Sequence, residues 1–167
     1  MENVQTFYAD AEPLVKAIND FAKRYGLIAI AAVDHFCYKC GSHEVFEQTR
    51  ALLEPESAFV YQSYISGRRI AILKLKKGLK TGLGEVTTLE LSDQKPDNSQ
   101  TTGFNHVEIY PVGVSYDELV STLRERGATL QKTERPHHTT YDIALGQFNV
   151  KLTQELLIEK IKKDEMN

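Results

Sequence analysis

A chain of 167 residues is long enough to bury one sizeable core and too short for two ordinary domains. Its 20 basic and 23 acidic residues give a net charge of -3. The chain therefore lacks the excess of basic residues that is typical of nucleic-acid-binding domains. No apolar run approaches the ~18 residues of a membrane span, and the N-terminus lacks signal-peptide features. We therefore expect a single cytoplasmic domain, 1–167, whose partners include neither nucleic acid nor membrane.

The first segment, 1–27, is predicted to form an amphipathic helix. Apolar side chains recur at helical spacing over 11–25. Asp10 is placed to cap the start of this helix and Gly26 to end it. The helix precedes the part of the chain in which a pattern is repeated.

Residues 28–92 predict a module of one strand, one helix and three further strands. The first strand covers 28–40, and Ser42 caps a helix that Pro55 closes. Glycines at 78, 82 and 84 predict a loop before the last strand. The three strands after the helix are expected at 58–66, 69–76 and 85–92.

A polar segment, 93–103, is predicted to link this module to a second one at 104–153. The second module repeats the order of the first. Ser115 and Glu118 form a capping box ahead of its helix. Its strands are expected around His106 and at about 128–134, 138–145 and 147–153.

The last segment, 154–167, is predicted to hold a helix over 154–163 and a short tail. The fold class expected for the whole chain is therefore α+β. It consists of two paired βαβββ modules, with one helix added before them and one after them.

The two modules open on similar stretches, 33–40 and 104–111, each with a histidine at its third position. These histidines are His35 and His106. A duplication that carries one histidine per copy can place two imidazoles around one point, which is an economical way to build a metal site. An ordinary core or cleft histidine is the alternative for each.

Strand side chains alternate between the two faces of a sheet, so the polar residues of these strands share a face. His35 lies on the same side as Cys37, and His106 on the same side as Glu108. The apolar side chains of the other face can pack under the helices. Repeat symmetry then directs four positions into a polar cleft: His35, Glu90, His106 and Lys151.

The motifs around these positions resemble the vicinal oxygen chelate superfamily, which includes glyoxalase I and the extradiol dioxygenases. The resemblance is carried by Asp34-His35, Asn105-His106-Val107 and Leu89-Glu90-Leu91. Within that superfamily, the chain resembles the YecM-like proteins of bacteria over nearly its whole length. That narrower resemblance is carried by Asp-His-x-x-x-x-Cys at 34–40, Gly-Arg-x-Ile at 67–70, Leu73-Lys74-Leu75, and Gly-Phe-x-His-x-Glu-Ile at 103–109.

The resemblance implies that His35, Glu90 and His106 hold a divalent metal ion, with zinc, nickel, iron and manganese not distinguished. Lys151 stands where the superfamily has a second glutamate, and an ammonium group is no ligand at neutral pH. Three ligands leave coordination positions open for water or substrate. In the rival arrangement, Lys151 pairs with Glu90 and fills the place of the metal.

The function expected first is that of a metal-dependent enzyme, an isomerase, lyase or oxygenase, acting on a small oxygenated substrate. The alternative is a non-catalytic protein that binds or sequesters a small molecule and whose metal site is vestigial. No catalytic residue is assigned, and both a monomer and a homodimer are compatible with the sequence. The candidate substrate-binding residues are Lys151, Arg68, Lys74 and Glu108.

Two cysteines, Cys37 and Cys40, have the spacing of a Cys-x-x-Cys motif. In one strand their side chains point to opposite faces, so we expect neither a disulfide nor a shared ion. Buried structural thiols are the prediction. His43, in the first turn of a helix, is expected to be solvated, and His137 and His138 are expected to lie in a surface loop.

Overall fold

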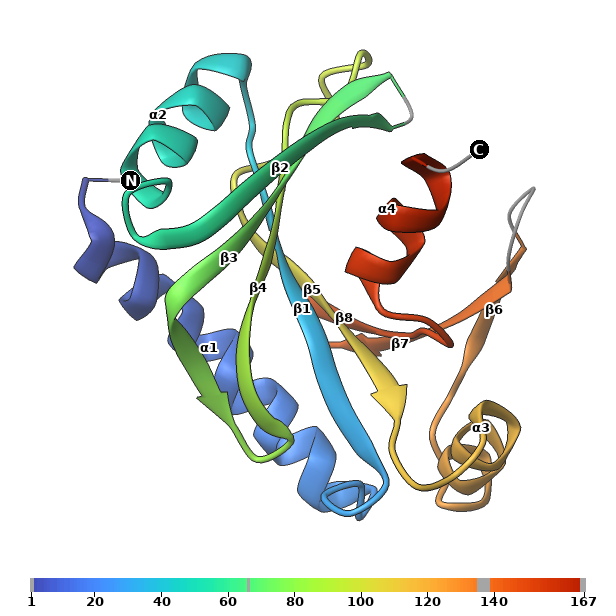
Figure 1. Ribbon diagram of the computed structural model, residues 1–167. Helices are drawn as coiled ribbons and strands as arrows, with labels where there is room; N and C mark the ends of the chain where they lie inside the picture. Colours follow the sequence, from blue (N-terminus) through green and yellow to red (C-terminus); the bar gives the residue numbers. More distant parts are fainter. Residues whose placement is uncertain (1, 66, 135–138, 166–167) are drawn as a thin grey trace.

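The computed structural model describes residues 2–65, 67–134 and 139–165. It is an α+β fold with four helices and one mixed sheet of eight strands (Figure 1). No helix in these ranges is both long enough and apolar enough to cross a membrane. The elements in chain order are α1 Val4–Arg24, β1 Ala31–Lys39, α2 His43–Leu53, β2 Ser57–Ile65, β3 Arg68–Thr81, β4 Gly84–Ser92, β5 Gly103–Pro111, α3 Tyr116–Glu125, β6 Gln131–Glu134, β7 Thr139–Leu145, β8 Phe148–Leu152 and α4 Leu157–Glu165.

The strands are arranged in the order β2-β3-β4-β1-β5-β8-β7-β6. Each half of the sheet is one βαβββ unit, and the halves meet where β1 pairs antiparallel with β5. Within each half the first and last strands run parallel, β1 with β4 and β5 with β8. The predicted fold class of two paired modules with added terminal helices is confirmed.

The register of the central strands aligns the polar positions of the two modules. Across the β1–β5 seam, His35 pairs with Glu108 and Cys37 pairs with His106. Cys37 also pairs with Glu90 on β4, and Glu108 pairs in the same way with Lys151 on β8. His35, His106 and Glu108 therefore lie on the two strands of the seam, and Glu90 lies on the strand next to β1.

The opposite face of the sheet carries the hydrophobic core. From α1, the fully buried Phe7, Leu14 and Ile18 pack into this core. Each such side chain contributes about 1.5–3 kcal/mol by leaving water, so the register that buries these apolar residues is strongly favoured. The central strands contribute Phe36, Leu89, Leu91, Val107, Ile109, Val150 and Leu152.

The C-terminal helix α4 lies between the two halves of the sheet (Figure 1). Two cavities lie between parts of α4 and the sheet, and both are lined by Ile158 and Lys162 of this helix. One of about 320 Å³ reaches Asp34 and Lys74, and one of about 140 Å³ reaches Tyr61 of β2. α4 thus sits against the polar face of the sheet.

Two predicted helix boundaries are wrong. Helix α1 starts at Val4, because Asn3 accepts a hydrogen bond from the Thr6 amide, and Asp10 lies inside the helix instead of capping it. Helix α4 starts at Leu157, three residues later than expected. Its first amide is bonded to Asp34, a residue far away in sequence, so local sequence could not indicate the start.

The predicted glycine-rich loop at 78–84 is also wrong. Strand β3 continues to Thr81, with an irregularity in its pairing to β4 between Lys74 and Leu79. A Cβ at Gly78 would lie 2.6 Å from the Glu85 side chain, so this glycine allows two strands to approach closely. The turn itself is confined to the residues between Thr81 and Gly84, where Gly84 has a φ of 106°.

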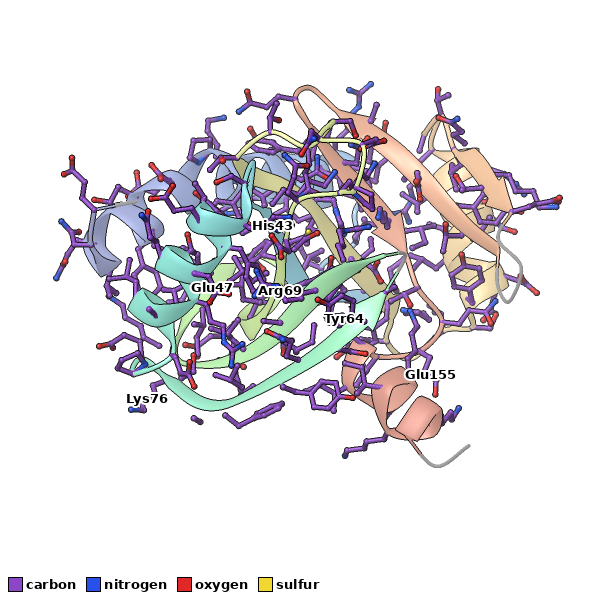
Figure 2. All side chains as sticks on the ribbon, turned by 90° about the horizontal axis from the view of Figure 1, so that it is seen from above. His43, Glu47, Tyr64, Arg69, Lys76 and Glu155 are labelled. Atoms are coloured by element: carbon purple, nitrogen blue, oxygen red, sulfur yellow. The ribbon has the colours of Figure 1, made fainter. Side chains whose placement is uncertain are left out.

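A buried ion network holds α2 against β3 and the end of β4. Arg69 donates to Asp93, which is 1% exposed, over 2.7 Å and also pairs with Glu47 of α2. His43 Nδ1 lies 2.9 Å from the other Asp93 oxygen. Figure 2 shows His43 and Glu47 of α2 next to Arg69. His43 is solvent-exposed, as expected, but its ring is also bonded to this network.

We expect Arg69→Met to lower the free energy of unfolding by about 2 kcal/mol, because a buried carboxylate loses charged hydrogen bonds. Burial raises the pKa of Asp93, but the bonds from Arg69 and His43 outweigh burial and lower it. A lowered pKa means that this stabilisation is present above the unfolded value of 3.8 and is lost on acidification. In urea denaturation, the loss of unfolding free energy between neutral and acidic pH should be smaller in the variant than in the wild type.

The control for this prediction is Lys132→Met, which removes an exposed ion pair with Glu134. It should change the free energy of unfolding far less than Arg69→Met does, because solvent screens an exposed pair. Equal effects of the two substitutions would contradict a structural role for the Arg69 network.

Candidate metal centre

Two histidines and two glutamates gather where the modules meet on the polar face. His35 is 0% exposed and His106 is 4% exposed. Donor atoms of His35, Glu90 and His106 all lie within 4.8 Å of one another. The structure therefore brings together the three residues that the sequence singled out as candidate ligands.

Each histidine is oriented by the residue that precedes it. His35 Nδ1 is 2.8 Å from Asp34 Oδ2, and His106 Nδ1 is 3.0 Å from Asn105 Oδ1. Both partners are acceptors, so each Nδ1 carries the hydrogen and the lone pair of a neutral ring is on Nε2. Carboxylate and amide oxygens behind a histidine are the usual means of orienting a metal ligand.

Both Nε2 atoms are buried, and neither has a hydrogen-bond partner among the residues that the structure describes. Leaving a buried polar atom unpaired costs about 1–3 kcal/mol, so two such atoms at one point are not explained by folding alone. His35 Nε2 lies 3.5 Å from Glu90 Oε2, beyond ordinary hydrogen-bond length. Donor atoms that share an ion at about 2.1 Å lie roughly 3–4 Å apart, so this donor set fits a divalent metal after small adjustments.

Glu108 belongs to the same centre. Its Oε1 is 4.0 Å from Nε2 of both His35 and His106, and its Oε2 is 3.8 Å from Lys160 Nζ of α4. The sequence placed Glu108 among the substrate-binding candidates because it shares a face with His106. Its position beside both imidazoles depends on the β1–β5 register, which short motifs do not reveal.

Cys37 is a residue of the centre that the sequence placed only in the packing. Its buried thiol donates to Glu90 Oε1 over 3.3 Å. Burial, followed by the charge of Glu90, raises the pKa of Cys37 well above its ordinary value, so the group remains a thiol and a donor. Cys40 is also buried and free, so the absence of a disulfide is confirmed.

The two histidines have opposite electrostatic surroundings. Burial by itself lowers the pKa of His35, but the negative charges of Glu108, Asp34 and Glu90 outweigh burial and raise it to about 10. For His106, burial and then the positive charge of Lys151 lower the pKa well below its ordinary value. In the metal-free protein His35 is therefore the protonated ring and His106 the neutral one.

Glu90 remains ionised in this setting. Burial raises its pKa, but the close approach of His35 and the positive charges of His106, His35 and Lys151 outweigh burial and lower it. The rival arrangement, in which Lys151 forms an ion pair with Glu90, is not found: within the described ranges no such pair lies inside 4 Å. The charge of Lys151 nevertheless acts on both Glu90 and His106.

The four substrate-binding candidates fall into three places. Glu108 and Lys151 are register partners at the centre itself. Arg68 donates from Nε to the Ser92 hydroxyl over 2.9 Å, beyond Glu90 along β4. Lys74 lines the 320 Å³ cavity beside α4.

Helix α4 is tied to this centre by polar contacts. Asp34 Oδ2, which orients His35, also accepts a hydrogen bond from the Leu157 amide over 2.9 Å. Lys160 donates to the Thr153 hydroxyl over 2.7 Å in addition to its contact with Glu108. The helix thus contacts one residue from each half-site.

The remaining histidines stay apart from the centre or lie outside the described residues. His43 belongs to the α2 network on the other side of the sheet, and His137 and His138 are not described.

Tyr64, a strand residue near the end of β2 that Figure 2 labels, has a side chain that is 73% exposed.

The fold and the donor set together define an α+β protein of two βαβββ modules with a candidate metal centre at their seam. The model of the YecM protein family matches residues 3–161, so the chain belongs to the YecM family. This confirms the family resemblance inferred from the motifs. No match is found among curated proteins.

Solved structures with this architecture include the structural-genomics protein EC4020. It matches with a TM-score of 0.76 and 19% identity, covering 99% of this chain and 94% of that one. Methylmalonyl-CoA epimerase from Mycobacterium tuberculosis matches with a TM-score of 0.49 and 14% identity, covering 78% and 91%. The enzyme of Streptomyces coelicolor in complex with 2-nitronate-propionyl-CoA matches with a TM-score of 0.46 and 14% identity, covering 75% and 99%. At 19% identity, the likeness to EC4020 shows a shared fold and no more.

We expect the two imidazoles of the metal-free protein to titrate far apart. His35 should keep its proton until the pH approaches its raised pKa of about 10, whereas His106 should stay neutral well below the ordinary pKa of 6.5. Because the folded pKa of His35 is raised, its proton stabilises the fold fully below the unfolded value of 6.5, and this contribution is lost as the pH rises through about 10. Imidazole nitrogen NMR shifts would show this directly, and two rings that both titrate near 6.5 would contradict it.

Proposed function

We propose that the chain is a metal-dependent protein of the vicinal oxygen chelate type, which binds a divalent ion through His35, Glu90 and His106. The observation that carries the proposal is the pair of buried, unpartnered Nε2 atoms that face a carboxylate. Three protein ligands leave room for oxygens of a small substrate. A bound ion supplies Lewis acidity, which stabilises an enolate or other oxyanion.

The residues around the ion site have separate tasks in this proposal. Asp34 and Asn105 hold the two rings with Nε2 towards the donor set. Glu108, 4.0 Å from both rings, accepts a proton from the substrate. Lys160 of α4 neutralises part of the Glu108 charge and holds the helix over the site, which limits the access of water.

A second candidate function rests on the contacts of His35 in the metal-free state. An imidazolium at this position already lies near Glu90 and Glu108, at 3.5 and 4.0 Å, and balances part of their charge. A protein that keeps this arrangement would need no ion and would bind or sequester its ligand without catalysis. Metal binding separates the two candidates.

Untagged wild-type protein should bind a divalent ion such as Zn²⁺ or Ni²⁺ in a calorimetric titration. Binding at neutral pH should release about one proton, because His35 must become neutral to act as a ligand. The apparent enthalpy should therefore vary with the ionisation enthalpy of the buffer. His35→Gln and His106→Gln should each lower the affinity at least about a hundredfold, while His43→Gln, outside the centre, should not change it.

The same titration tests the role of Glu108. Glu108→Gln should retain metal affinity within about threefold if the carboxylate serves the substrate, and should lose about tenfold or more if it is a fourth ligand. A wild-type protein that binds none of the divalent ions would contradict the metal-dependent function and leave the non-catalytic binding protein.

The orienting carboxylate gives a further prediction. Asp34→Asn keeps an oxygen acceptor but removes the charge, so we expect metal affinity to fall by about 10–100-fold. It should also weaken the start of α4, because the same oxygen bonds the Leu157 amide. Hydrogen exchange of that amide should be faster in the variant. Unchanged affinity and exchange would contradict the coupling of the helix to the centre.

A further inference from the structure

Four half-buried cations lie within electrostatic reach around Lys39, the last residue of β1. Lys39 is on the same strand as His35 and pairs with Ser92 of β4. Arg68 donates to the hydroxyl of the same buried serine. Lys95 and Lys151 are also within electrostatic reach of Lys39. The group therefore comes from four segments: β1, β3, β8 and the segment after β4.

Two of these cations act directly on the candidate metal centre. The charge of Lys151 acts on Glu90, His106 and Cys37. The charge of Lys39 acts on His106 and Cys37. The two ammonium groups thus influence the centre electrostatically from different strands, and the charges of Arg68 and Lys95 act in turn on Lys39.

These lysines have no anionic partner within the described part of the chain. No carboxylate lies within 4 Å of the ammonium groups of Lys39, Lys95 or Lys151. Lys160, by contrast, has Glu108 at 3.8 Å. Like charges that are partly removed from water repel one another more strongly than at an open surface, so an unpaired group of this kind favours an anion.

The charge balance of a loaded centre points the same way. Two neutral imidazoles, the carboxylates of Asp34, Glu90 and Glu108, the ammonium of Lys160 and one divalent ion sum to zero. Lys39 and Lys151 then leave a surplus of two positive charges beside the ion position. A ligand with one or two negative charges would neutralise that surplus.

We propose that the ligand of this centre is a small oxygen-rich anion, whose charged group pairs with Lys39 and Lys151 while neighbouring oxygens reach the ion position. Arg68 and Lys95 extend the positive surface towards Ser92 and bind further anionic groups of a longer ligand. The inference deepens the proposed function and rests on it for the ion.

Two bidentate probes of different charge test the proposal. Oxalate is a dianion, whereas acetohydroxamic acid is neutral in solution and carries a single negative charge when it chelates an ion; both offer two neighbouring oxygens. Metal-loaded wild-type protein should prefer oxalate. Lys39→Met and Lys151→Met should each weaken oxalate at least about tenfold and should weaken acetohydroxamic acid by a smaller factor, because its bound form carries less negative charge. Metal affinity should be unchanged or tighter, because each change removes a cation beside a cation.

Two matched lysine variants serve as comparisons. Lys76→Met alters a lysine of β3, labelled in Figure 2, whose ammonium bonds the Pro55 carbonyl. This variant should leave both probes unaffected. Lys74→Met alters the lysine of the cavity beside α4. If Lys74→Met weakens oxalate and the other two substitutions do not, the proposed position of the anion is overturned.

Titration of the metal-free protein distinguishes this inference from the proposed function. Oxalate binding that depends on Lys39 and Lys151 supports the anion site even if no ion binds. If wild type and the Lys39→Met, Lys151→Met double variant bind oxalate equally in both the metal-free and the metal-treated protein, the inference is wrong. Thermal unfolding of each variant checks that affinities are compared between folded proteins.

Discussion

The antiparallel seam between β1 and β5 is the constraint on which the candidate centre depends. It places His35 opposite Glu108 and Cys37 opposite His106, so side chains from two modules lie within a few ångströms of each other. A shift of one residue would turn the histidines into the hydrophobic core and expose the apolar residues between them. The burial of Phe36, Val107 and Ile109 therefore fixes the geometry of a polar site on the other face.

The two half-sites have diverged in charge, and this difference adds to the effect of Glu108 in setting the opposite behaviour of the two imidazoles. The first module supplies Asp34 behind its histidine and Glu90 beside it, whereas the second supplies Asn105 and Lys151 at the matching positions. His35 consequently holds a proton and His106 does not. A symmetric site would place two equivalent rings in competition for one proton, but the divergence gives each ring one defined state.

Sequence patterns predicted the fold and the grouping of three candidate ligands because both depend on local periodicity and on repetition. His35, Glu90 and His106 could be paired from the duplicated order of elements alone. The roles of Glu108 and Cys37 could not, because they arise from cross-strand register and from a bulge-containing seam. The continuation of β3 through Gly78 was missed for a related reason: a glycine that permits close strand contact and one that makes a turn look alike in sequence.

Helix α4 illustrates how a weakly apolar element can still be held in a defined place. Leu157, Ile158 and Ile161 are only partly buried, so packing alone fixes the helix less firmly than α1. Its defined contacts are polar and go to Asp34, Thr153 and Glu108, of which two belong to the candidate centre. An ion that draws on the same carboxylates changes the charge available to Leu157 and Lys160. The position of α4 and the occupancy of the centre are therefore linked through shared oxygen atoms, and the direction of that link depends on whether Glu108 turns towards the ion or towards Lys160.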